Sequence, residues 1–277
     1  MSVATRIRGV DVRMMRPVRD SPFSIMALWC WYDGAAFHGY QGQQGLRTVQ
    51  SELMRAFSAA GLSRNPVVAG RTDKGVSARM QVLSARLERD VTPTNAMERL
   101  APHLPDDLGL VVARDAKPGF HAAWSATSKE YRYRLTQEEA GDVRLLERTA
   151  ALIPGSRDFR VFHFKTSEQK PRTVDRVEVV EEHGSLTLRF VGQQFARHMV
   201  RMLVGGMTSV ARGGVSLDVF ERGLLEQHNF HCPTAPPEPL TLWDVGYPDD
   251  VDPFTNEERQ AFLMPVTRGR TPTPRLR

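Results

Sequence analysis

The sequence predicts an α+β fold made of two successive units of similar make-up, divided near residue 117. Short apolar or alternating segments rich in β-branched and aromatic residues indicate strands. Segments with helical periodicity that begin at a capping residue lie between them. The 277 residues include 41% hydrophobic and 25% charged residues, the balance of an ordinary globular protein.

The first unit opens with the apolar segment Phe23 to Tyr32, which predicts a buried strand that ends at an Asp-Gly turn and buries the Cys30 thiol. Thr48 is placed to cap a helix, and Gly61 suits its C′ position. The apolar face of that helix is expected to contain Val49, Leu53, Met54 and Phe57. The remaining elements of this unit are expected at 67–71 (strand), 81–87 (alternating strand), 94–103 (helix) and 108–114 (strand).

The second unit follows Pro118-Gly119. Segments 177–181 and 185–191 predict a hairpin that turns at His183-Gly184. The other elements are expected at 129–135 (strand), 145–152 (helix), 195–210 (helix), 217–227 (helix) and 240–245 (strand). The predicted division is a basic tail over 1–21, an N-terminal α+β half over 22–116, a C-terminal α+β half over 117–264 and a tail over 265–277.

Location in the cell is predicted from the length of the apolar runs, the two cysteines and the first twenty residues. No apolar run approaches the ~18–20 residues of a membrane span. The two cysteines form no disulfide framework, so an intracellular protein is expected, in the cytoplasm or nucleus. The Arg-rich first twenty residues fit a plain basic tail or a mitochondrial transit peptide.

The charge of the chain favours an RNA partner. The formal net charge is +5, and the basic residues are 32 Arg and 5 Lys. The guanidinium group binds phosphate through two donors and stacks on bases. A GC-rich genome would produce the same Arg bias without any RNA partner.

The segment from Gly70 to Ala78 contains a candidate reactive carboxylate. Asp73 lies between Arg71 and Lys74 in a tight turn after an apolar segment. Neighbouring cations favour the ionised carboxylate, which makes Asp73 a plausible nucleophile or electrostatic stabiliser. The alternative is an Asx-type turn in which Asp73 bonds its own backbone.

The predicted helix over 195–210 has one broad apolar face and a narrow polar stripe that carries Arg197, His198 and Arg201. Arg197 and Arg201 would stand four residues apart, where like charges repel unless an anion lies nearby. The pattern indicates a mostly buried helix that touches a cleft and binds a carboxylate or phosphate. Arginines that reach water along the edge of the helix are the alternative.

The segment Tyr131-Arg132-Tyr133-Arg134 would place aromatic rings on one face of a strand and cations on the other. Aromatic rings stack on exposed bases, so this pattern suits single-stranded or flipped nucleotides. A half-buried strand with an exposed basic face is the alternative.

His228, His231 and Cys232 lack the pairing of a structural zinc site, and no dinucleotide-binding, P-loop, hydrolase or zinc-protease motif is present.

Together these segments resemble the TruA family of tRNA pseudouridine synthases. Six blocks match its motifs in order along most of the chain: 32–41 (YDGxxFxGWQ), 70–78 (GRTDxGVxA), 120–133 (FHARFSATxRxYRY), 158–162 (HDFxxF), 195–205 (FLxHMVRxxxG) and 235–242 (APxxGLxL). Departures occur at Ala123, at Pro239 and in the shorter link between Tyr133 and Asp158.

The resemblance implies two ferredoxin-like (RRM-like) halves that form a joined antiparallel sheet with flanking helices and a central basic cleft. It implies that Asp73 is the essential aspartate, that Arg201 pairs with it and that Tyr131 packs on the target base. It implies that Arg71 enters the space left by the flipped uridine. Further RNA contacts are expected from Lys74, Arg197 and Leu242.

The implied reaction is isomerisation of uridine to pseudouridine in tRNA, without cofactor or metal. The form GRTDKGVSA resembles members that act at the base of the anticodon loop, around tRNA positions 38–40. Asp73 would attack the sugar C1′, add to base C6 or assist loss of the 2′ proton. Tyr131 is a candidate for the base that removes the C5 proton, although the ordinary pKa of a tyrosine is near 10. Alternatives are a non-catalytic tRNA-binding protein or chaperone and a synthase for another RNA. A homodimer is left open.

Overall fold

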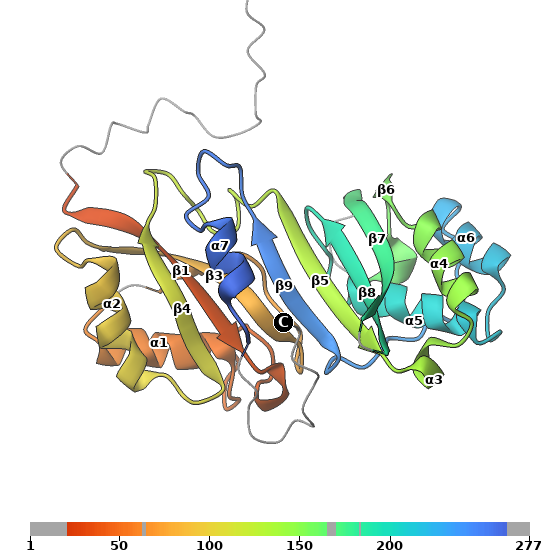
Figure 1. Ribbon diagram of the computed structural model, residues 1–277, viewed down its shortest axis with the longest axis horizontal. Helices are drawn as coiled ribbons and strands as arrows, with labels where there is room; N and C mark the ends of the chain where they lie inside the picture. The colour runs from red at the N-terminus through yellow and green to blue at the C-terminus, as the bar shows by residue number, and fades with distance from the viewer. Residues whose placement is uncertain (1–20, 63–64, 165–169, 183, 265–277) are drawn as a thin grey trace, which may run out of the picture.

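The protein is described by a computed structural model for residues 21–62, 65–164, 170–182 and 184–264. It is a mixed α+β structure built on one large, mostly antiparallel sheet (Figure 1). The strands follow the order β4-β1-β3-β9-β5-β8-β7-β6, and β2 pairs with β3 off this path. The predicted α+β class is therefore confirmed. The predicted tails lie almost entirely outside the described residues.

The N-terminal part of the sheet contains the elements predicted for it. Thr48 caps α1 by accepting a hydrogen bond from the Ser51 amide, while the Ser51 hydroxyl accepts one from the Thr48 amide. Gly61 follows this helix with a left-handed φ of 66°, as its C′ position requires. The elements are β1 (Phe23–Tyr32), α1 (Val49–Ala59), β2 (Val67–Val68), β3 (Ser77–Glu88), α2 (Pro93–Leu100) and β4 (Leu108–Asp115), with 3-10 turns at Gly34–Ala36 and Ala101–His103.

Two predictions in this part differ from the structure. The strand expected over 67–71 is limited to Val67–Val68, because the chain turns away from β3 toward the loop that carries Asp73. The strand expected over 81–87 starts earlier, at Ser77, and is buried on both faces over most of its length. The segment that contains α7 (Asn256–Ala261) covers the face of β3 that carries Arg79, which bonds the Arg259 and Phe262 carbonyls, so neither face alternates between core and water. Burial of Cys30 is confirmed.

The C-terminal part repeats the mixture of strands and helices. The hairpin is confirmed as β7 paired with β8. Sequence analysis did not anticipate α3, β6 or α7, which are short. The elements are β5 (Ser128–Leu135), α3 (Gln137–Ala140), α4 (Val143–Leu152), β6 (Gly155–Arg157), a 3-10 turn (Arg160–Phe162), β7 (Arg172–Glu182), β8 (Ser185–Gly192), α5 (Met199–Ala211), α6 (Leu217–Leu225), β9 (Leu240–Gly246) and α7 (Asn256–Ala261).

The helix predicted over 195–210 begins only at Met199. His198 immediately before it has a left-handed φ of 62°, which breaks the helical path. Arg197 therefore lies in the approach to α5, and the predicted four-residue spacing of Arg197 and Arg201 on one helix is wrong.

The two parts of the sheet are joined by a short seam between β3 and β9. These strands pair in parallel at only two positions, Ser77 with Thr241 and Ala78 with Leu242. After β9 the chain crosses back over the N-terminal part, where Phe254 and Phe262 pack edge-on against the buried Trp29 ring at 5.9 and 5.3 Å. Figure 1 shows α7 lying across β1 and β3.

Over the described ranges, no helix combines the length and apolarity needed to cross a bilayer.

Candidate active site

Asp73 lies on a tight turn that leads into β3. The Val76 amide donates a 3.1 Å hydrogen bond to the Asp73 carbonyl, and Gly75 adopts the left-handed φ of 81° that closes the turn. The preceding Thr72 is buried, and its hydroxyl lies 2.8 Å from the Tyr32 hydroxyl at the end of β1. The carboxylate is thus carried by a loop whose backbone is held on both sides.

A second loop, after β1, holds the Asp73 turn in place. The Tyr40 amide donates to the Thr72 carbonyl at 3.0 Å. A Cβ on Gly34 would lie 2.2 Å from the backbone of Val76, so only glycine permits this approach. This contact gives a physical reason for the Asp-Gly pair that precedes the loop.

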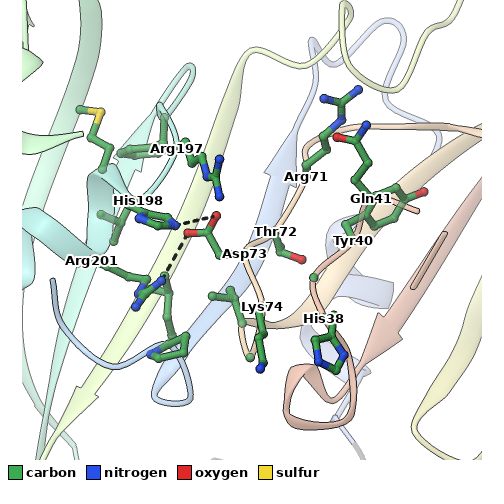
Figure 2. A pocket seen from close by; sticks show the side chains of 18 of the residues that line it. His38, Tyr40, Gln41, Arg71, Thr72, Asp73, Lys74, Arg197, His198 and Arg201 are labelled. Atoms are coloured by element: carbon green, nitrogen blue, oxygen red, sulfur yellow. Dashed lines mark ion pairs between the residues drawn. The ribbon is translucent and has the colours of Figure 1, made fainter. Parts of the chain in front are cut away.

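Arg201 faces Asp73 from the other side of the cavity (Figure 2). Its Nη1 lies 3.7 Å from Asp73 Oδ2, and the side chains are 14% and 24% exposed. Its Nε donates a 2.8 Å hydrogen bond to the Ala235 carbonyl. The Ala235 loop can pass this close to α5 because Gly205 has no side chain, since a Cβ there would lie 1.9 Å from the Pro233 carbonyl oxygen.

His198 is a site residue that sequence reasoning did not assign. Its Nε2 lies 3.7 Å from Asp73 Oδ1, on the opposite oxygen from Arg201. Burial lowers the pKa of His198, and the charges of Arg201 and Arg197 act in the same direction against the opposing effect of Asp73. Its sequence signals were its place in the polar stripe and its match to the histidine of the FLxHMVRxxxG motif, and helical periodicity could not reveal its left-handed backbone.

Tyr131 lies in the cavity wall, 8% exposed, with its ring edge-on to Phe195 at 5.3 Å. Burial, with a smaller effect from the Asp73 charge, raises the pKa of its hydroxyl well above the ordinary value. A phenol with a raised pKa is a still poorer base than the sequence suggested. Leu242 pairs with Tyr131 across β5 and β9 but is fully buried and outside the set of residues that line the cavity, so its contact with RNA stays a prediction.

These groups surround one cavity of about 990 Å³. The structure brings together all the predicted site residues except Leu242: Arg71, Asp73, Lys74, Tyr131, Arg197 and Arg201. Figure 2 shows Arg71 and Lys74 on the side of the N-terminal part, with Arg197 extending toward Asp73 from the side of α5. The volume is at the upper end of small-ligand sites, and a cationic rim attracts a polyanion.

The arrangement can stabilise and orient one ionised carboxylate beside an aromatic ring. Arg201 and His198 approach different oxygens of Asp73, which restricts rotation of the carboxylate. Within the described ranges, no group of three or more His, Cys, Asp and Glu side chains is arranged to hold a metal ion. The chemistry that this geometry supports directly is nucleophilic, electrostatic or proton-transfer chemistry by Asp73.

Comparison with known proteins gives a consistent result. Residues 150–248 match the family model described as tRNA pseudouridine synthase. The chain is 34% identical to tRNA pseudouridine synthase A of Thermococcus kodakarensis, over 80% of this chain and 85% of that protein. It is 36% identical to the enzyme of the same name from Shouchella clausii, over 84% of this chain and 97% of that protein.

Among solved structures, the archaeal box H/ACA Nop10–Cbf5 complex is similar at a TM-score of 0.32 and 17% identity, over 60% of this chain and 38% of that chain. That likeness is too distant to define the fold. The two curated relatives, in contrast, exceed 30% identity over most of both chains. The chain therefore belongs to the TruA family of tRNA pseudouridine synthases.

Proposed function

We propose that this protein converts uridine to pseudouridine in tRNA, with Asp73 as the catalytic carboxylate. The observation that carries the proposal is the position of Asp73, on a fixed turn and facing Arg201 and His198 across a cavity that also contains Tyr131. The two relatives compared above are named tRNA pseudouridine synthase A. We further propose that the target uridines lie at the base of the anticodon loop, as the GRTDKGVSA motif indicates.

The reaction requires the target base to leave the RNA stack, at a cost of a few kcal/mol. Arg71 is exposed at the cavity rim and is placed to enter the space that the uridine vacates. The flipped base then packs on the Tyr131 ring, which Phe195 holds at a fixed angle. Lys74 and Arg197 at the same rim bind the flanking phosphates.

Asp73 starts the chemistry from beside the flipped nucleotide. Attack on C1′, addition to C6 and removal of the 2′ proton all need an ionised carboxylate whose oxygen faces the sugar–base junction, and Arg201 stabilises that charge. The N1–C1′ bond breaks, the uracil rotates and a C5–C1′ bond forms. The C5 proton is lost and N1 gains a proton, so no oxidant or reductant is needed.

We propose that the cavity lies between two ferredoxin-like halves, at 22–116 and 117–264. The support is a repeated strand order. In the first half the neighbouring strands are β4-β1-β3-β2. In the second half they are β9-β5-β8-β7, with the short β6 added at the outer edge. When the four main strands of each half are numbered along the chain, both halves have the sheet order fourth, first, third, second. In each half, helices also follow the first and third of these strands, as in a β-α-β-β-α-β unit.

Release of tritium from tRNA that carries [5-³H]uridine tests the activity. We expect release that depends on enzyme and on Asp73, and pseudouridine mapped to the anticodon stem-loop. Binding of tRNA without any release would identify a tRNA-binding protein or chaperone instead. Release from another cellular RNA but not from tRNA would identify a synthase with a different substrate. Light scattering on the same preparation distinguishes a monomer from a homodimer.

A further inference from the structure

His198 has a backbone conformation that its local structure does not explain. Its φ of 62° lies in the left-handed region, which is strained for a non-glycine residue. Residues at the N-cap of a helix commonly bond the first free amides with their side chain. The His198 side chain makes no such bond to α5 within the described chain. Neither helix propensity nor capping therefore accounts for this geometry.

The left-handed turn instead directs the imidazole toward the reactive carboxylate. Nε2 of His198 lies 3.7 Å from Asp73 Oδ1, while Arg201 approaches Oδ2 at the same distance (Figure 2). On its other side the imidazole packs against the Phe164 ring, with centroids 5.5 Å apart. The ring is thereby confined between an aromatic side chain and Asp73. Hydrogen bonds in a catalytic site are often long before substrate binds and shorten in the complex.

The charges around His198 favour a neutral ring at neutral pH. Arg197 and Arg201 flank it on the α5 side, Asp73 faces it from the turn before β3, and Lys74 and Glu238 line the same cavity. Burial and the two arginines lower its pKa below the ordinary value despite Asp73. In the tautomer that carries its proton on Nε2, a neutral imidazole donates one hydrogen bond to a carboxylate. It does so without adding a second cation that would reduce the reactivity of Asp73.

We propose that His198 is a positioning residue that donates its Nε2–H to Asp73 Oδ1 in the tRNA complex. With Arg201 on Oδ2, it fixes the plane of the carboxylate so that the remaining lone pairs face the flipped uridine. The inference rests on the proposed function, because it concerns how the Asp73 carboxylate is aimed during that reaction. His198 itself does not touch the reacting atoms.

Two substitutions separate this role from a structural one. Glutamine places its side-chain N–H donor at about the reach of the imidazole Nε2, whereas glycine relaxes the backbone and removes the donor. We expect His198→Gln to keep the single-turnover rate within about threefold of wild type. We expect His198→Gly to lose about 10- to 100-fold of that rate, the size of one hydrogen bond to a charged group. Both should bind tRNA within about twofold of the wild-type Kd, and free imidazole should partly restore His198→Gly.

The pH profile gives a readout that packing alone would not change. Protonation of His198 below its lowered pKa would surround Asp73 with two cations and slow the chemical step. The wild-type rate should therefore fall more steeply between pH 7 and 5 than the rate of His198→Gln, which has no imidazole to protonate. The exposed His231, outside the cavity, provides a matched control as His231→Gln, which should behave as wild type at every pH.

Several results would overturn the proposal. A wild-type single-turnover rate for His198→Gly would do so, as would a loss confined to tRNA affinity. Equal losses of rate in His198→Gln and His198→Gly would show that the donor is irrelevant. Failure of the proposed function is distinguishable, because the wild-type enzyme itself would then release no tritium, and both proposals would fall together.

Discussion

Arg201 and Asp73 come from opposite parts of the sheet, and their nearest charged atoms lie 3.7 Å apart across the cavity. Arg201 is fixed from behind by its 2.8 Å hydrogen bond to the Ala235 carbonyl, and Asp73 by the turn before β3. Because the backbone of each residue is held within its own part of the chain, the packing of the two parts brings the pair together. The catalytic consequences can therefore be tested one partner at a time.

Replacement of Asp73 by asparagine should abolish tritium release while leaving tRNA affinity within about threefold of wild type. The amide has nearly the same shape but is uncharged and is neither a nucleophile nor a base. Filter binding measures the affinity and tritium release the turnover. Product from Asp73→Asn above a control without enzyme would exclude Asp73 as the catalytic group.

Arg201→Met should lower the single-turnover rate by about 100-fold, the typical effect of removing one preorganised electrostatic partner from a catalytic site. The double variant Asp73→Asn/Arg201→Met should be hardly less active than Asp73→Asn alone. Groups that act as a unit have non-additive effects on rate. Additive losses in this double-mutant cycle would show that Arg201 acts independently of Asp73.

Tyr131→Phe should retain tRNA affinity and the shape of the pH–rate profile between pH 7 and 9. The pKa of Tyr131 is raised, so its hydroxyl stays protonated throughout this range and is not a titrating base. Tyr131→Ala should be far less active, because it removes the ring on which the base packs. A change in the shape of the pH–rate profile of Tyr131→Phe between pH 7 and 9, relative to wild type, would show that the hydroxyl takes part in the chemistry.

Affinity for tRNA should fall steeply with salt, since the net charge is +5 and the cavity rim carries several cations. Lys74 is exposed at that rim, and Lys74→Gln should reduce the slope of log K against log[salt] by about 0.7–0.9, the effect of one lost phosphate contact. A salt titration of both proteins checks this. An unchanged slope would remove Lys74 from the RNA-binding surface.

Gly205→Ala should destabilise the protein by about 1–3 kcal/mol, the usual cost of overpacking. The added Cβ would meet the Pro233 carbonyl oxygen at 1.9 Å and displace the Ala235 loop that holds Arg201, so turnover should fall as well. Gly214→Ala is the matched control, because its Cβ would make only an ordinary contact at 3.5 Å. Urea denaturation gives the free energy of unfolding, and similar values for the two variants would contradict the packing argument.

The elements that the sequence predicted well are those with a strong local signal. The Thr48 cap and the hairpin of β7 and β8 are both determined by near neighbours in the chain. The burial of β3 on both faces and the packing of α7 over Trp29 depend on strands far away in sequence, so no local pattern could reveal them.

The same distinction applies to the candidate site. Asp73 was recognisable as an acid between two cations, and its pairing with Arg201 followed from the family resemblance. His198 was not assigned a role because its approach to Asp73 depends on one left-handed φ angle that interrupts an apparently continuous helix. Leu242 is fully buried beside the cavity, and a motif match carries no information on which side chains cover one another.

The two-residue pairing of β3 with β9 has a mechanical consequence. Ser77 in this pairing follows Asp73 by four residues, and Leu242 pairs with Tyr131 in the next strand. In a rotation about an axis, displacement grows with distance from the axis. If the two parts pivot about this junction, their outer edges sweep far while the atoms around Asp73 move least. Such a pivot would let the outer edges of the two parts follow the curved body of an RNA while the reacting groups near the axis keep their spacing.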